Sequence, residues 1–222
     1  MKRPLVIFGA SSFAEIVGLY FARGEEYEPV AYCVDDEFAV SPEIFGLPLI
    51  PLSELPAKYS PDETAFHVAV TYTHLNRLRL RKVAELKALG FSPASYVSSA
   101  AYVDPSAVLG EHVFIFEDNT VQPLVTIGDG TILWSGNHIG HHSQVGEAVF
   151  ISSHVVVSGH CSIGDRTFIG VNASIGNNVS IGIDNWILPG TVILSDTGDD
   201  EMWRPQKPAL ATKKPTEAFL PK

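Results

Sequence analysis

The sequence of 222 residues contains little cysteine and little basic charge. Its two cysteines, Cys33 and Cys161, are too few for a disulfide framework and form no CxxC pair of the kind that binds zinc. Fifteen lysine and arginine residues stand against 25 aspartate and glutamate residues, and the formal net charge of −10 argues against a nucleic-acid partner. No targeting segment and no run of about 18 apolar residues is visible, so we expect no membrane insertion and a cytoplasmic, reducing location.

The first part of the chain alternates short apolar runs with amphipathic segments. Residues 5–9 predict a strand, and residues 13–23 predict a helix because their apolar side chains recur at spacings of three and four. Further strands are expected at 30–34, at 66–71 and near 94–97, with a helix over 74–89 that Gly90 ends. This order predicts an α/β domain with a parallel, Rossmann-like sheet over residues 1–98.

From Val103 the pattern changes to a period of six. Every sixth residue from 103 to 193 is aliphatic, sixteen in all without a gap, and the following residue is glycine in eight of the sixteen hexads. Hexapeptide periodicity is typical of an all-β solenoid in which three hexads close one coil, so sixteen hexads make about five coils. The solenoid domain is expected over residues 99–198, followed by a C-terminal tail at 199–222.

The hexads resemble those of the left-handed β-helix acyltransferases, the hexapeptide transferases, over residues 103–198. Together with the βαβ unit that reads VIFGAS at 6–11 and VDD at 34–36, the chain resembles the sialic acid O-acetyltransferase-like group, which includes bacillosamine and perosamine N-acetyltransferases. The resemblance implies a left-handed parallel β-helix that forms a homotrimer, with acetyl-CoA in the groove between subunits. It also implies a nucleotide-linked sugar on the small domain, N- or O-acetylation of that sugar, and a place in polysaccharide biosynthesis.

A catalytic histidine is implied by the same resemblance. In the stretch from His138 to Gly146 the matching residue is His141. A neutral imidazole suits the reaction, because the attacking amine or hydroxyl must lose a proton near pH 7. His142 stands where the family usually has an acidic residue that orients the base, so that role is unassigned, and Phe150 stands where the bacillosamine enzymes have a second histidine.

The donor side of the site follows from the coil length. Adding eighteen and thirty-six to 141 gives Gly159 and Asn177, and the pair Ser158-Gly159 matches the family's Ser-Gly step, whose backbone amide holds the thioester oxygen. Residues 103–198 contain one basic residue, Arg166, and nine acidic ones. We therefore expect the adenosine phosphate of CoA to meet Lys213 or Lys214 in the tail.

On the acceptor side, the turn between the first strand and helix is expected to hold a phosphate of the nucleotide sugar; its residues are Gly9, Ala10, Ser11 and Ser12. It lacks the GxGxxG pattern, so NAD is not expected. Asp35 and Asp36 match the family's acidic pair that contacts the base, although acidic residues are also common at strand ends without a ligand. Trp134 and Asn137 are candidate contacts to the acceptor sugar.

Five histidines cluster in the sequence, and a metal site is the rival explanation for them; they are His138, His141, His142, His154 and His160. Their hexad positions place them on different faces and coils, apart from two that lie eighteen residues apart, so no metal is expected. Three other functions stay open: a small-molecule acyltransferase of the serine acetyltransferase type, an inactive hexapeptide scaffold, and a solenoid of the carbonic anhydrase type.

Overall fold

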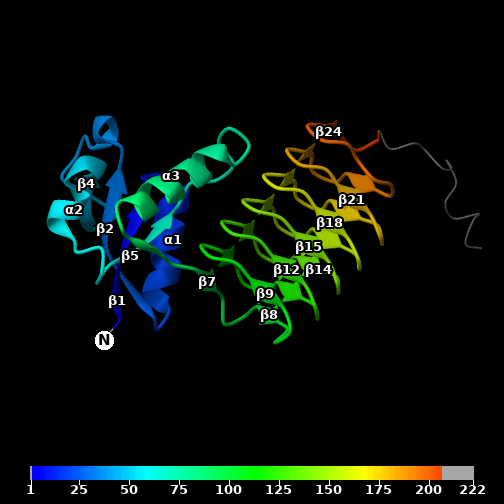
Figure 1. The fold of residues 1–222 in the computed structure, drawn as a ribbon, viewed down its shortest axis with the longest axis horizontal. Coiled ribbons are helices and arrows are strands. Elements are labelled where there is room, and N and C mark those ends of the chain that lie inside the picture. The colour runs from blue at the N-terminus through cyan, green and yellow to red at the C-terminus, as the bar shows by residue number, and fades with distance from the viewer. Residues whose placement is uncertain (1, 207–222) are drawn as a thin grey trace, which may run out of the picture.

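The computed structural model describes residues 2–206, which form an α/β domain followed by a parallel β-helix (Figure 1). The α/β sheet has the order β3-β4-β2-β1-β5-β6 and is parallel except at its β3 edge. Its strands are β1 (Arg3–Phe8), β2 (Tyr27–Val34), β3 (Glu43–Ile44), β4 (Leu47–Pro51), β5 (Ala65–Val68) and β6 (Ser92–Pro93). Its helices are α1 (Ser12–Arg23), α2 (Leu55–Lys58) and α3 (Arg77–Ala88), with short 3₁₀ turns at η1 (Asp36–Phe38) and η2 (Leu52–Glu54).

The five parallel strands of this sheet, numbered along the chain, lie in the order 3-2-1-4-5, which is the strand order of a doubly wound fold without its sixth strand. The predicted Rossmann-like domain is confirmed. Within the described part of the chain, no helix combines the length and the apolar character needed to cross a bilayer.

The β-helix is a three-sided coil of two-residue strands separated by four-residue corners. Its first face contains β7 (Tyr96–Val97), β10 (Phe114–Ile115), β13 (Ile132–Leu133), β16 (Phe150–Ile151), β19 (Phe168–Ile169), β22 (Trp186–Ile187) and β24 (Met202–Trp203). The second face contains β8 (Tyr102–Val103), β11 (Thr120–Val121), β14 (His138–Ile139), β17 (Val156–Val157), β20 (Ser174–Ile175) and β23 (Val192–Ile193). The third contains β9 (Val108–Leu109), β12 (Thr126–Ile127), β15 (Gln144–Val145), β18 (Ser162–Ile163) and β21 (Ser180–Ile181). We number each corner after the face that it follows.

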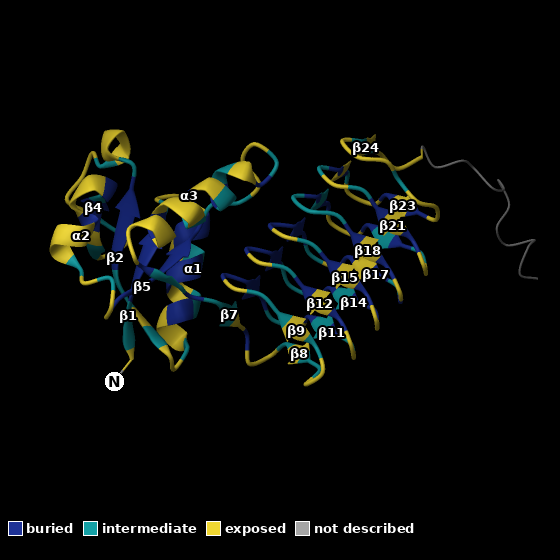
Figure 2. Cartoon of the chain, viewed as in Figure 1, coloured by how far each residue is buried: buried dark blue, intermediate teal, exposed yellow. Residues whose placement is uncertain are grey.

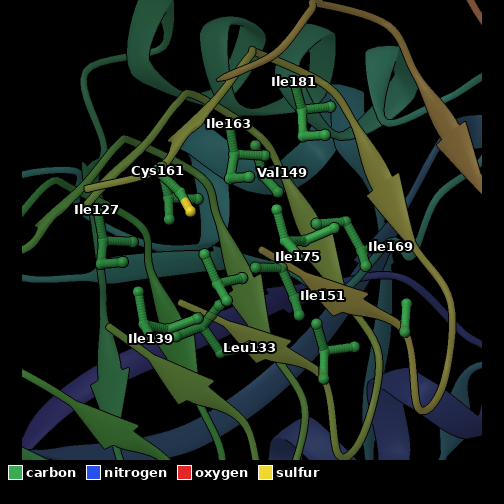
Figure 3. Close-up of a cluster of buried hydrophobic side chains, with 14 of the residues drawn as sticks. Ile127, Leu133, Ile139, Val149, Ile151, Cys161, Ile163, Ile169, Ile175 and Ile181 are labelled. Carbon is green, nitrogen blue, oxygen red and sulfur yellow. The ribbon is translucent and has the colours of Figure 1, made fainter. Parts of the chain in front are cut away.

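The aliphatic residue of each hexad points into the coil, as predicted. From Ile115 to Ile193 all fourteen are buried, whereas Val103 and Leu109 in the first coil are partly covered. Figure 3 shows these side chains filling the interior, with Cys161 among them as a small apolar side chain. Stacked burial of this kind supplies the main stabilisation of a solenoid, because each coil covers the apolar side of its neighbour.

The α/β domain packs against the first face of the β-helix. Strands β10, β13 and β16 are buried on both sides, whereas the third-face strands alternate exposed and buried residues (Figure 2). Aromatic side chains fill the junction: the ring of Tyr20 from α1 lies 4.9 Å from that of Phe116, and Phe21 lies 5.8 Å from Phe114. The second corner, away from this junction, is left open.

A buried arginine joins the two domains at the third corner. Arg79 from α3 is 0 % exposed and pairs with no carboxylate within residues 2–206, yet its guanidinium finds five acceptors. They are Gly130 O at 2.9 Å, Ala148 O at 2.8 Å, Val70 O at 3.2 Å, Asn76 Oδ1 at 3.0 Å and Thr71 O. Burial lowers the pKa of Arg79 to about 9. One side chain thus ties the loop after β5 to two successive coils.

Several boundaries differ from the sequence-based expectation, and β1 and β2 begin two to three residues earlier than expected. The helix expected over 74–89 begins only at Arg77, because His74, Leu75 and Asn76 have positive φ angles of 52°, 49° and 65°. The strand expected at 66–71 ends at Val68. The strand expected near 94–97 is two pieces, since β6 completes the α/β sheet while β7 begins the β-helix. Strand β4 was missed, because its sequence LPLIP contains two prolines.

Two histidines are buried where the α/β domain meets the first coil. The rings of His67 on β5 and His112 in the third corner stack 4.1 Å apart at an interplanar angle of 7°. His112 Nε2 accepts the Val68 N–H at 2.7 Å, and His67 Nδ1 lies 2.9 Å from the carbonyl oxygen of Ala94. Burial lowers the pKa of His67 to about 4 and holds the pKa of His112 well below its usual value. Both imidazoles are therefore neutral in the folded protein at pH 7.

We expect Arg79→Lys to lower the free energy of unfolding by about 3 kcal/mol, since a single ammonium group leaves several buried carbonyl groups unpaired. Urea denaturation measures the change. Arg81→Lys, at an exposed site on the same helix, is the matched control and should leave the denaturation midpoint nearly unchanged. Equal urea midpoints for the two variants would contradict the stabilising role of Arg79 between the two domains.

The buried histidine pair predicts acid sensitivity. Because the folded pKa of His67 lies below the ordinary value of 6.5, the unfolded chain takes up a proton that the folded chain does not, and stability falls as the pH drops from about 6.5 towards 4. In His67→Gln the free energy of unfolding should fall less steeply as the pH drops, and the difference in slope should correspond to at most one bound proton. Urea midpoints at a series of pH values give the slope, and His74→Asn, which changes an exposed histidine, should keep the wild-type slope.

Candidate active site

Successive coils place His141, Gly159 and Asn177 in one column at the second corner. Strand pairing fixes this alignment, because His138 pairs with Val156 in the next coil and each coil is eighteen residues long. All three residues lie at the same step of their corner. His141 and Asn177 are exposed, whereas Gly159 between them is buried.

Backbone and ring contacts hold His141 in place. Its N–H donates to Gln122 Oε1 at 2.9 Å from the preceding coil, and its carbonyl oxygen accepts the His160 N–H at 2.9 Å from the following coil. Its Nδ1 lies 3.1 Å from Nδ1 of His142, so one ring donates to the other. When His141 is the donor, its Nε2 carries the free lone pair.

Glycine at position 159 makes room for the His141 ring. A Cβ atom there would lie 2.8 Å from Cε1 and 2.9 Å from Nε2 of His141. Gly140, next to the histidine, has a similar constraint, since a Cβ atom would lie 2.4 Å from the carbonyl carbon of Ser158. At these two positions the adjacent coils leave no room for a side chain.

The amide of Gly159 already has a partner. Its N–H donates to Oδ1 of Asn177 at 3.0 Å. A thioester oxygen can accept this hydrogen bond only by taking the place of the asparagine oxygen. Ser158 is tied in through its backbone, with its N–H donating to Ile175 O and its carbonyl oxygen accepting from the hydroxyl of Ser143.

His142 and His160 stack beside His141. Their rings lie 4.7 Å apart at 18°, while the His141 ring stands edge-on to both. Among the described residues, one ring nitrogen from each of these three histidines lies within 4.8 Å of the other two. The expectation that the histidines scatter is wrong for these three, because the neighbours 141 and 142 and the stacked pair 142 and 160 share a corner. His138 lies on strand β14, and His154 lies in a first corner.

A second candidate region lies at the junction of the domains. A cavity of about 380 Å³ is lined by Ser12 at the start of α1, by Tyr72 from the loop after β5 and by Trp134 and Phe150 from the β-helix. Trp134 stacks on Phe116, with centroids 4.5 Å apart at 8°, and its buried indole N–H finds no hydrogen-bond partner in the described part of the chain. The structure therefore brings together Ser12 and Trp134 of the predicted acceptor residues.

Asn137 does not join them. It is 1 % exposed, its Oδ1 accepts the Val155 N–H at 2.8 Å, and its amide nitrogen donates to the carbonyl oxygen of Trp134. Both ends of the side chain are thus used inside the corner. The prediction that Asn137 contacts the acceptor is corrected, since it bridges two coils instead.

The acidic pair after β2 also has partners within the chain. Asp35 pairs with Lys82, whose side chain is buried, and Asp36 Oδ1 accepts the Ser53 N–H at 3.1 Å. The hydrogen bonds from Ser53 hold the pKa of Asp36 below its usual value. These contacts agree with the alternative that both aspartates are strand-end residues without a ligand. The base of a bound nucleotide would have to share Asp35 with Lys82.

The turn after β1 is close-packed at one end and open at the other. Gly9 has a φ of 132°, and a Cβ atom there would lie 2.8 Å from the carbonyl oxygen of Ala69. Ala10, Ser11 and Ser12 are exposed, and Ser11 makes no side-chain cap to α1. The hydroxyl of Ser11 therefore leaves the first amides of α1 uncapped.

Arg166 is the one basic residue between 103 and 198 that could meet the phosphates of CoA. Arg166 forms a bidentate pair with Asp184, at 2.7 and 3.0 Å, and is therefore engaged. Lys213 and Lys214 lie outside the described residues. The sequence analysis missed Gln122 and Lys82, because both contact residues that are distant in the sequence. It also missed the contact between the rings of His160 and His141. The coil length of eighteen residues was the one sequence signal that could have indicated these neighbours.

We expect Asn177→Ala to speed hydrogen exchange at the Gly159 amide, because the substitution removes the acceptor of that N–H. Amide exchange followed by NMR measures it. The Cys161 amide, which donates to the hydroxyl of Ser143, is the control within the same spectrum. If Gly159 stays as protected as in the wild type, its amide has another acceptor.

Comparisons with known proteins agree with this architecture. No protein-family model and no curated protein matches the chain. Among solved structures, perosamine N-acetyltransferase from Caulobacter crescentus in complex with CoA and GDP-perosamine is 28 % identical, with 90 % of this chain and 92 % of that chain covered and a TM-score of 0.79. A histidine-to-asparagine mutant of the same enzyme, with the same ligands, is 27 % identical with the same coverage and a TM-score of 0.80.

The acetyltransferase domain of PglB from Neisseria gonorrhoeae is 25 % identical, with 90 % of this chain and 96 % of that chain covered and a TM-score of 0.81. These matches span both domains, and the resemblance inferred from the hexads and the βαβ unit is confirmed. The chain thus has the fold of the left-handed β-helix acetyltransferases and is similar, over both of its domains, to the perosamine N-acetyltransferase and the PglB acetyltransferase domain.

Proposed function

We propose that this chain transfers the acetyl group of acetyl-CoA to an amino group of a nucleotide-linked sugar, with His141 as general base. The observation that carries the proposal is the column in which the His141 ring lies against Gly159, above Asn177. Relatives at 27 and 28 % identity hold CoA and GDP-perosamine, which supports both the donor and the class of acceptor.

The chemistry needs one base and no covalent enzyme intermediate. The amine nitrogen attacks the thioester carbonyl carbon and forms the C–N bond, while Nε2 of His141 accepts the proton that the nitrogen loses. The tetrahedral intermediate then breaks its C–S bond, and the CoA sulfur leaves with the proton from the imidazolium. Nδ1 of His141 stays hydrogen-bonded to His142, at 3.1 Å, throughout. His142 thereby does what the family's acidic residue does elsewhere, as a hydrogen-bond acceptor that orients the ring.

The oxyanion contact is assigned to Gly159. Its N–H points to Oδ1 of Asn177, and the carbonyl group of that side chain occupies the place that the thioester oxygen takes when acetyl-CoA binds. A preorganised amide of this kind stabilises the charge that develops in the transition state. Asn177 is exposed and can turn away when it is replaced.

The acceptor cavity and the base lie on different corners of one chain. Trp134 belongs to a first corner, whereas His141 belongs to a second corner. A second copy must therefore bring its cavity to this chain's His141, and three copies around an axis satisfy every site equally. We accordingly propose a homotrimer, with Ser12 and Trp134 on the acceptor side and Lys213 or Lys214 at the CoA phosphates.

Because acetyl-CoA and nucleotide sugars are metabolites of the cytoplasm, we propose that the reaction takes place there, as a step that supplies modified sugars for polysaccharide assembly.

Thiol release from acetyl-CoA, assayed with UDP-, dTDP- and GDP-linked 4-amino-sugars, tests the proposal. We expect His141→Asn to lower turnover roughly 10²- to 10⁴-fold, because the attacking amine loses its proton acceptor. His154→Asn, at an exposed histidine in a different corner, should keep wild-type turnover.

Full turnover in His141→Asn would show that His141 is not the general base. A wild-type protein that binds acetyl-CoA but releases no thiol with any of these sugars would move the acceptor to another class of compound.

A further inference from the structure

Three exposed imidazoles meet at the second corner. His141 and His142 are adjacent in sequence, and His160 lies eighteen residues after His142, so that all three project from two consecutive coils. The Nδ1 atoms of His141 and His142 are 3.1 Å apart, and one nitrogen from each of the three rings lies within 4.8 Å of the others. The proposed function uses His141 and His142 but gives His160 no task.

We propose that this triad binds a divalent transition-metal ion, Zn²⁺ above all, and that the bound ion switches the enzyme off. Imidazole nitrogen is a preferred ligand of Zn²⁺, and three protein ligands with a water molecule in the fourth position are a common zinc coordination. Mg²⁺ and Ca²⁺ prefer oxygen ligands and should not bind here.

The geometry needs only small adjustments. Zn–N bonds of about 2.0–2.1 Å in a tetrahedron put neighbouring ligand nitrogens about 3.4 Å apart. The separation of 3.1 Å between the His141 and His142 nitrogens is already close to this value. The remaining separations, up to 4.8 Å, close by rotation of exposed rings about their side-chain bonds. The exposure of all three residues leaves room for the water ligand.

The electrostatic setting favours a cation. Residues 103–198 carry nine acidic side chains and one basic side chain, and that one, Arg166, is paired with Asp184. The chain as a whole has a formal net charge of −10. The three imidazoles therefore meet on a β-helix with a net negative charge, which lowers the free energy of a bound divalent ion.

Binding of the ion is incompatible with the role proposed for His141. A neutral imidazole has one nitrogen with a free lone pair, and the other nitrogen carries the hydrogen. When the ion takes that lone pair, no atom of the ring can accept the proton of the attacking amine. The inhibition rests on the proposed function, whereas the binding of the ion does not.

Isothermal titration of the tag-free, EDTA-treated full chain with ZnCl₂ tests the site, and the absorption of bound Co²⁺ reports the imidazole ligands. We expect one ion per chain. His160→Asn should weaken Zn²⁺ binding roughly tenfold or more. His154→Asn is the matched control and should bind as the wild type does. Both residues have positive φ angles, 57° and 59°, which asparagine tolerates.

In the thiol-release assay, Zn²⁺ should inhibit the wild type, and EDTA should restore turnover. His160→Asn should turn over normally without metal and need a higher Zn²⁺ concentration for inhibition, by the same factor as its loss of affinity. Equal Zn²⁺ affinities for the wild type and His160→Asn, or binding of Mg²⁺ as tight as that of Zn²⁺, would overturn the site. Zn²⁺ binding that needs His160 in a chain without acetyl transfer would support the site and refute only the proposed function.

Discussion

The eighteen-residue register of the coils is the constraint on which the candidate site depends. Strand pairing is parallel and in register from one coil to the next, as in the series Thr120, His138, Val156 and Ser174 on the second face. A residue in a corner therefore contacts the residue eighteen positions later. This rule puts His141 against Gly159 and Gly159 against Asn177, although the three are far apart in the sequence. The inward aliphatic residues keep the register, because a shift by one residue would turn them outward.

The α/β domain decides which parts of the β-helix remain accessible. It covers the first face through an aromatic junction and fastens to the third corner through Arg79, while the second corner stays open. The same junction leaves the cavity beside Trp134 and buries the pair His67 and His112. Docking of the domain thus forms the cavity beside Trp134, which lies on a different corner from His141. That separation is the reason why a second copy of the chain belongs in the proposed site.

The repeating part of the fold was predictable from the sequence, and the contacts between distant segments were not. Hexads determine burial locally, so the coils and the parallel α/β sheet followed from the spacing of apolar residues. The beginning of α3 did not, because the left-handed turn at residues 74–76 is held by contacts to the β-helix, such as the hydrogen bond from Asn76 to Arg166 O. Strand β4 was hidden by its prolines.

In the candidate site, too, the spacing was predictable from the sequence and the side-chain contacts were not. The column from His141 to Asn177 followed from the coil length, but its chemistry depends on contacts that the spacing does not encode. The Gly159 amide donates to Asn177, and the side chain of Asn137 is hydrogen-bonded at both ends within the β-helix. His160 completes a triad with His141 and His142. Each depends on side-chain direction, which varies among residues at equivalent steps of the coil.

The claim that the coil register positions His141 as the base is tested most directly by the kinetics of Gly159→Ala beside Gly176→Ala. A Cβ atom at 159 would lie 2.8 Å from the His141 ring, whereas at 176 it would meet the flexible end of Leu194 at 3.2 Å. We predict that Gly159→Ala loses most of its kcat for acetyl transfer while circular dichroism shows an intact fold, and that Gly176→Ala keeps both. Wild-type kcat in a folded Gly159→Ala protein would contradict the claim.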